Sequence, residues 1–345
     1  MFEASGFPIV QAPMLGAGAE ALAIAVSRVG GLGSFPAAGS TPGQLLESAR
    51  AIRAATPAPF AINLFILEPC KPDPGVVRAA IARLAPWRAR YGLPAQSEPP
   101  IWAQDFAAQF EALLEAAPPF ASFTFGCLRA EQASALHERG SRIIGTATCV
   151  EEALAWQAAG ADAICAQGIE AGGHRGSFLA QHEDLGTLAL VRAIKSACSL
   201  PVIAAGGLMD GQAIAKALAH GADAVQIGTA FLLADEATTS APWRAAIARA
   251  GPDSTRMTRV FSGRRARGIE NAFMIEMREH ERDIPAYPVQ NALTQDLRAA
   301  AARAGKSDCL SLWAGAGVAL ARPGAAGDIA RALWSEAQNL APTTL

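Results

Sequence analysis

Ten residues of the sequence, 167–176, bring an imidazole, a guanidinium and a carboxylate together with four glycines. His174 can do acid–base chemistry, because an unperturbed imidazole titrates at about pH 6.5. The apolar run 163–166 precedes the loop and reads as a buried strand. Since barrels place their chemistry in loops at the carboxyl ends of strands, we predict that His174 is catalytic. Arg175 is interpreted either as a phosphate partner or as part of a loop salt bridge.

Two further glycine-containing loops favour a phosphate site. One contains Gly206 and Gly207, after the apolar run 201–205. The other comprises Gln226, Ile227, Gly228 and Thr229. Glycines expose backbone N–H donors and a helix N-terminus adds a positive end, so such loops suit an anion. Tight helix–strand packing would explain either loop alone, but the two in this order favour phosphate.

A mononucleotide such as flavin mononucleotide (FMN) fits these loops better than a nucleoside triphosphate, because the sequence has no P-loop. The planar flavin ring needs an apolar wall and amide partners. We expect Asn63 and Gln167 to supply the amides. Gly172 and Gly173 allow the backbone to lie close to the ring. The expected wall, at the end of the first strand, is Gln11, Ala12, Pro13 and Met14.

These residues all follow predicted strands, which alternate with helical segments. The expected strands are 9–14, 32–35, 60–65, 120–125, 142–147, 163–167, 201–205 and 224–228. Eight β/α steps within about 230 residues predict an α/β fold, a (β/α)8 TIM barrel. A doubly wound open sheet is the competitor, but the first turn lacks the GxGxxG fingerprint.

An added, mainly helical cap domain is expected outside these steps. Segment 66–100 is rich in proline and carries one predicted helix, 75–91. Such a long insertion after a strand suits a lid. We divide the chain into an FMN-binding barrel (1–65, 119–233 and 309–325), a helical cap or substrate domain (66–118 and 234–308) and a C-terminal tail helix (326–345).

Composition limits the partners of this 345-residue chain. The net charge is −2 and no basic run occurs, so neither nucleic acid nor an anionic membrane is expected. The six cysteines are scattered without a CxxC pair, and no metal site is predicted. The amino terminus lacks the features of a signal peptide, which indicates a cytoplasmic protein. A small-molecule substrate is expected, in a monomer or homodimer.

The motifs together resemble the nitronate monooxygenase family, formerly called 2-nitropropane dioxygenases, in its class I bacterial form. The resemblance spans about Pro8 to Gly317. It is carried by segments 11–14, 30–33, 63–65, 167–176, 205–207, 226–229, 262–268 and 312–315. It implies an FMN-dependent oxidoreductase that oxidises alkyl nitronates, such as propionate 3-nitronate, with O₂ to a carbonyl compound and nitrite.

By the matching motif, His174 takes the place of the family's catalytic histidine. Asn63, Gln167, Gly172, Gly207 and segment 226–229 match its FMN contacts. Related sequences often have histidine where Thr124 stands, which leaves the fine substrate preference open.

Two alternatives remain. One is an NAD(P)H:quinone reductase or FMN-dependent enoyl reductase on the same scaffold. The other is a barrel that binds a phosphate ligand without redox chemistry.

Overall fold

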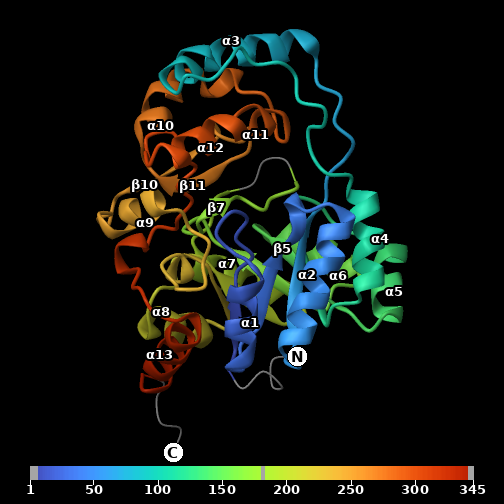
Figure 1. Cartoon of the computed structure of the whole chain (residues 1–345). Coiled ribbons are helices and arrows are strands. Elements are labelled where there is room, and N and C mark those ends of the chain that lie inside the picture. The colour runs from blue at the N-terminus through green and yellow to red at the C-terminus, as the bar shows by residue number, and fades with distance from the viewer. Residues whose placement is uncertain (1–6, 180–182, 341–345) are drawn as a thin grey trace, which may run out of the picture.

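The computed structural model describes residues 7–179 and 183–340. Its centre is a parallel barrel of eight strands (Figure 1). The strands are β1 (Ile9–Gln11), β2 (Gly33–Pro36), β3 (Phe60–Phe65), β4 (Phe120–Thr124), β5 (Arg142–Ala147), β6 (Ala163–Gln167), β8 (Val202–Ala205) and β9 (Ala224–Ile227). Their order is β1-β9-β8-β6-β5-β4-β3-β2, and a bridge between Val10 and Leu32 joins the two end strands. The predicted TIM barrel is confirmed.

Eight helices alternate with these strands around the outside. They are α1 (Glu20–Arg28), α2 (Pro42–Ala55), α4 (Phe106–Ala116), α5 (Ala130–Glu138), α6 (Val150–Ala159), α7 (Thr187–Ala197), α8 (Gly211–Ala219) and α13 (Ala326–Gln338). Local sequence sets their ends. Thr41 and Gln44 form a capping box at the start of α2, and Gly160 ends α6 with a φ of 93°.

Two insertions interrupt the alternation. The first contains α3 (Pro74–Arg90) and lies between β3 and α4, which itself packs on α2. The second separates β9 from α13, which packs on α8 and α1 and so completes the helical ring. The segment expected to form the cap therefore includes a helix of the barrel layer, α4. The expected tail helix supplies the eighth position, although residues 341–345, like 1–6 at the other end, lie outside the described part.

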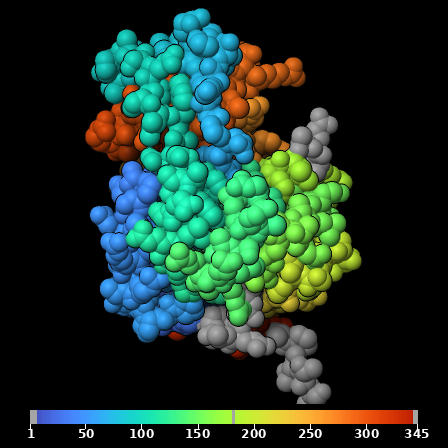
Figure 2. All heavy atoms as spheres, turned by 90° about the vertical axis from the view of Figure 1, so that its right-hand side faces the viewer, coloured from blue at the N-terminus to red at the C-terminus, as the bar shows by residue number. Residues whose placement is uncertain are grey.

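The insertions build a second hydrophobic core above the barrel mouth. The second one contributes α9 (Ala241–Ala248), α10 (Ala272–Met277), α11 (Val289–Leu293) and α12 (Gln295–Arg303). Trp87 of α3 contacts Phe273 edge-on at 5.2 Å, and Arg88 forms a 2.7 Å ion pair with Asp296. Figure 2 shows the first insertion extending from the barrel to this upper part, where α3 packs over the other helices of the cap.

A three-stranded antiparallel sheet joins the cap to the loop that carries His174. Its strands are β10 (Thr255–Thr258), β11 (Ala266–Ile269) and β7 (Gly173–His174). Ala266 pairs with His174 and Arg267 with Gly173. The tail after the eighth strand was expected to be mostly helical. It also contains these strands, because the glycine-rich loop offers its backbone as an edge for pairing.

Candidate active site

A cavity of about 1190 Å³ lies between the barrel mouth and helices α11 and α12. All the site residues predicted from the sequence line it, except Gln11. The residues at its wall are Ala12, Pro13, Met14, Asn63, Gln167, Gly172, Gly173, His174, Gly206, Gly207, Gln226, Ile227, Gly228 and Thr229. The barrel brings them together because each lies in the carboxyl-terminal half of a barrel strand or in the loop that follows it.

Gln11 has a different place. Its side chain is fully buried in β1, its Oε1 accepts a hydrogen bond from Ser34 N at 2.9 Å, and its Nε2 donates to Ala12 O. The amide thus ties β1 to β2. Its expected part in the cofactor site has no support in the structure, since period-two alternation along the strand turns this side chain away from the cavity.

The glycine loops after β8 and β9 form a cradle of backbone donors at the place where a phosphate site is predicted. Gly206 and Gly207 have φ values of 123° and 71°, which favour glycine. The backbone N–H groups of Gly206, Gly207, Gly228 and Thr229 donate to no residue in the described parts of the chain. Thr229 also begins the short 3-10 helix η3 (Thr229–Phe231). These four donors are available to an anion.

The amino end of α8 contributes less than the sequence suggests. Asp210 accepts a hydrogen bond from Ala213 N at 2.8 Å, and Glu336 of α13 accepts one from Gly211 N at 3.0 Å. These carboxylates already occupy the first donors of the helix and complement its dipole. The loop N–H groups and the start of η3 are therefore the part of the cradle that remains available to an anion.

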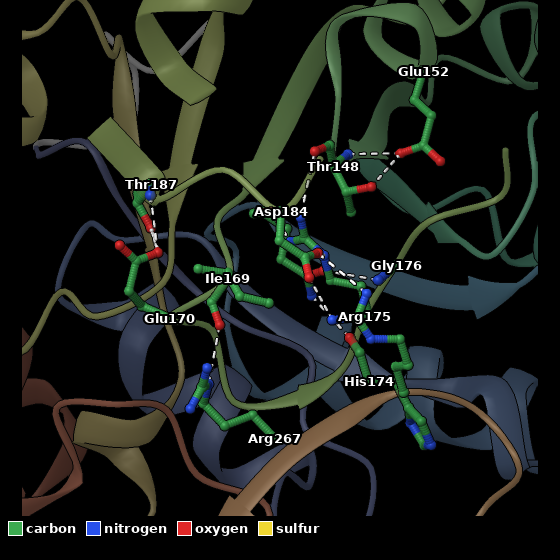
Figure 3. A network of polar contacts seen from close by, with 12 residues as sticks. Thr148, Glu152, Ile169, Glu170, His174, Arg175, Gly176, Asp184, Thr187 and Arg267 are labelled. Atoms are coloured by element: carbon green, nitrogen blue, oxygen red, sulfur yellow. Dashed lines mark hydrogen bonds and ion pairs between the residues drawn. The ribbon is translucent and has the colours of Figure 1, made fainter. Parts of the chain in front are cut away.

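The loop 167–176 is fixed by polar contacts on both sides (Figure 3). Glu170 accepts hydrogen bonds from Thr187 N and Oγ1, both at 2.9 Å. Arg267 donates to Ile169 O at 3.0 Å. Gln167 donates from Nε2 to His174 O at 3.0 Å and accepts from Gly176 N at 2.7 Å. Gln167 is expected to pair with the flavin ring, but both its amide nitrogen and its amide oxygen form hydrogen bonds within the loop.

Arg175 lies in this network and not at the cavity wall. Its guanidinium donates to Gln167 O and Thr148 O and lies 3.6 Å from Asp184 (Figure 3). The side chain is 3% exposed. Of the two interpretations of Arg175, the structure favours the loop salt bridge.

Other amides and hydroxyls at the cavity have donor or acceptor atoms that are not used by described residues. Asn63 uses Nδ2 to donate to Ser122 O and Oγ, while its Oδ1 has no partner in the described chain. Gln226 lines the cavity, and its side-chain amide makes no hydrogen bond to described residues. Thr124 Oγ1 lies 3.3 Å from Thr146 Oγ1, so one hydroxyl of this pair can donate elsewhere.

The imidazole of His174 is held by a serine from the cap. Nε2 of His174 lies 2.8 Å from Ser262 Oγ, and Ser262 Oγ donates to Arg264 O at 3.1 Å. A hydroxyl has one proton, so Ser262 accepts from His174 and the ring carries its proton on Nε2. Nδ1, without a partner in the described residues, is left for a ligand.

Aromatic rings enclose this imidazole. Phe125 and Tyr287 contact it edge-on at 5.6 and 5.7 Å, and Trp313 lies at 5.5 Å. Burial, together with the guanidiniums of Arg264 and Arg298, lowers the pKa of His174 to about 3. The ring is therefore neutral at physiological pH in the free protein.

The cap supplies site residues that sequence reasoning did not single out. Tyr287 and Arg298 line the cavity from the region of α11 and α12, and Ser262 reaches His174 from the basic loop 261–268. The loop and Trp313 were noticed as motifs without assigned roles. For Arg298 the sequence offers only one weak indication: it is a charged residue directly after Leu297, an apolar residue of an alanine-rich helix that is buried in the structure.

Fold and site together define a (β/α)8-barrel enzyme with free backbone N–H donors after two strands and a cavity under a helical cap. Comparison with known proteins agrees. A family model described as nitronate monooxygenase matches residues 2–336. The chain is 42% identical over 339 residues to a nitronate monooxygenase of Pseudomonas aeruginosa, covering 95% of each.

Two solved structures share the architecture. A nitroalkane oxidase from Streptomyces ansochromogenes superposes with a TM-score of 0.90 at 39% identity, covering 98% of this chain and 97% of that one. FabK from Thermotoga maritima gives a TM-score of 0.76 at 25% identity, with coverage of 98% and 94%. The chain belongs to the nitronate monooxygenase family and is an oxidoreductase. No helix in the described ranges is both long and apolar enough to cross a membrane.

Proposed function

We propose that the protein is an FMN-dependent nitronate monooxygenase. It converts alkyl nitronates, such as propionate 3-nitronate, and O₂ to a carbonyl compound and nitrite. Membership of the family supports the substrate class. The observation that carries the proposal is a neutral imidazole at the wall of a cavity that also holds the glycine cradle.

The donors of the cavity fit FMN. Four free backbone N–H groups, at Gly206, Gly207, Gly228 and Thr229, suit its single phosphate. Ala12 to Met14 give an apolar wall, and Asn63 and Gln226 supply amides for the ring edge. Gly228 leaves its backbone accessible, whereas a side chain there would be crowded, since an added Cβ would lie 3.3 Å from Ala12 Cβ. FMN, when bound, supplies the electron transfer and O₂ chemistry.

His174 sets which form of the substrate is used. Its free Nδ1 can accept a proton, but a group whose pKa is lowered to about 3 is a weak base toward a carbon acid. The site therefore favours nitronates, which have lost that proton before binding, over neutral nitroalkanes. The surrounding Phe125, Tyr287 and Trp313 exclude water from the ring and leave an apolar space for the alkyl group.

The test starts from purified protein. Flavin released by denaturation is identified, and protein that carries no flavin and cannot take up FMN would rule the proposal out. Anaerobic mixing then separates the alternatives. Loss of flavin colour with a nitronate, and nitrite formation when O₂ is admitted, support the monooxygenase. Rapid loss of colour with NADH or NADPH would favour a reductase. Bound FMN without turnover of either kind would favour a binding protein.

A further inference from the structure

The cavity wall contains a cation that no part of the described chain neutralises. Arg298 of α12 lines the cavity, and the salt bridges of the described residues do not include it. Nη2 donates to Asn291 O and Oδ1 at 2.9 and 3.0 Å, and Nε donates to Thr294 O at 3.3 Å. Nη1 has two N–H groups and one described acceptor, Ser311 Oγ at 3.5 Å. At least one donor is therefore free.

The titratable groups around Arg298 do not supply a negative charge at neutral pH. Burial raises the pKa of Tyr287 to about 12 and also raises the pKa of the Cys309 thiol. The nearest carboxylate on the same helix, Asp296, is engaged by Arg88 at 2.7 Å on the α3 side. The neighbouring His174 is neutral, so no described group beside Arg298 offsets its positive charge. The two carboxylates of the cavity lining, Glu20 and Glu47, belong to α1 and α2.

A half-buried guanidinium without a carboxylate partner is costly, and a bound anion reduces that cost. The free Nη1 donor and the positive charge of Arg298 suit an anion whose planar group presents two equivalent oxygens. A nitronate has this shape and one negative charge, whereas the parent nitroalkane has the same oxygens without the charge. Backbone and amide oxygens of Asn291 and Thr294 fix the guanidinium, so little side-chain entropy is lost on binding.

We propose that Arg298 adds a second selection, beside that of His174, for the anionic nitronate over the neutral nitroalkane, by donating from its free Nη1 N–H to a nitronate oxygen. The inference rests on the proposed function for its substrate. It adds a specificity-determining residue from the cap to a site whose other groups come mainly from the barrel.

The direct test measures binding of nitrate, a planar monoanion that undergoes no turnover, by calorimetry on the flavin-loaded protein. We expect Arg298→Gln to weaken nitrate binding about 100-fold and Arg298→Lys, which keeps the charge without the hydrogen bonds that orient the guanidinium, about 10-fold. Arg303→Gln is the matched control, because Arg303 is an exposed residue of the same helix. It should bind nitrate like the parent protein.

Kinetics provide the second readout. For one compound supplied as nitronate or as nitroalkane, Arg298→Gln should raise KM for the nitronate and reduce the nitronate preference by a similar factor of about 100. If Arg298→Gln fails to fold, Arg298→Lys decides. No nitrate binding to the parent protein, or equal binding by both Arg298 variants and the parent, would overturn the inference. Either result leaves the proposed function standing if nitronates are turned over. Conversely, Arg298-dependent nitrate binding without nitronate turnover would keep the anion site and reject the activity.

Discussion

Nε2 of His174 lies 2.8 Å from Oγ of Ser262, a residue 88 positions later in the chain. The contact crosses from the barrel to the cap and sets the tautomer of the imidazole. Ser262 is itself buried and donates to Arg264 O, so its role as acceptor is fixed. The imidazole is thus provided by one part of the fold and oriented by another.

Removing the Ser262 hydroxyl should disturb this orientation. Ser262→Ala leaves the Nε2–H of His174 without its acceptor, and we expect kcat/KM for nitronates to fall about 10-fold. Ser262→Thr keeps a hydroxyl and should retain more of the activity. Steady-state nitrite formation measures both. Parent-like kinetics of Ser262→Ala would show that the contact does not matter for turnover.

The lowered pKa of His174 makes a prediction for stability. Between about pH 6.5 and pH 3 the unfolded chain takes up a proton at His174 that the folded protein does not. The contribution of this residue is complete above pH 6.5 and is lost as the pH falls toward 3. Urea unfolding from pH 7 to pH 4 should therefore show a steeper loss of stability for the parent than for His174→Asn. Parallel curves would mean that His174 titrates normally.

His174→Asn also separates the two forms of the substrate. It removes the proton acceptor, so any residual turnover of neutral nitroalkanes should disappear, whereas nitronates, which need no deprotonation, should lose less. Paired assays of one compound in both forms give the ratio. Unchanged nitroalkane turnover would remove His174 from the proton-transfer role.

Flavin content should depend on the cradle glycines. Gly206 has a φ of 123°, which residues with side chains rarely adopt, and an added Cβ would lie only 2.7 Å from Thr187 Oγ1. Gly206→Ala should reshape the loop and lower FMN affinity at least 10-fold, together with a loss of stability of about 1–3 kcal/mol. Gly43→Ala is the control, since nothing lies within 4 Å of a Cβ there. Fluorescence of released flavin reports the bound fraction, and equal content in both variants would contradict the cradle.

Glu152 should matter for the His174 loop although it lies outside the cavity. This fully buried carboxylate accepts hydrogen bonds from Thr148 N and Oγ1 at 2.7 and 2.8 Å and from Phe178 N at 2.6 Å (Figure 3). Glu152→Ala leaves these donors buried and unpaired, so we expect a loss of about 3 kcal/mol in the free energy of unfolding. Glu151→Ala, at the neighbouring exposed position, should change it by less than about 0.5 kcal/mol. Similar stability of the two variants would contradict the role.

Local patterns were enough to predict the barrel. Each strand is a short apolar run, and the helices show apolar spacing and end signals that are local in the sequence. Thr41, which caps α2, and Gly160, which ends α6, are examples. The cradle could be predicted for the same reason, because its glycines follow strands directly. Within the predicted helical cap, α11 and α12 are two separate helices that meet at Thr294. Its buried hydroxyl bonds Phe261 O at 2.6 Å, a partner that local periodicity does not reveal.

The use of each polar group depended on distant partners. Gln11 and Gln167 are amides at strand ends, as the sequence says, but Ser34 and the His174 loop take up their hydrogen bonds. Asp210 and Glu336 likewise occupy the start of α8.

The sequence by itself therefore determined the barrel, its ring of loops and the position of His174 in one of these loops. These features follow from periodicity and from residue types next to strands. Only the tertiary structure decided the state of that histidine. Ser262 and Arg298 come from the cap, far along the chain, and hydrogen bonding, burial and charge act through space and not along the sequence.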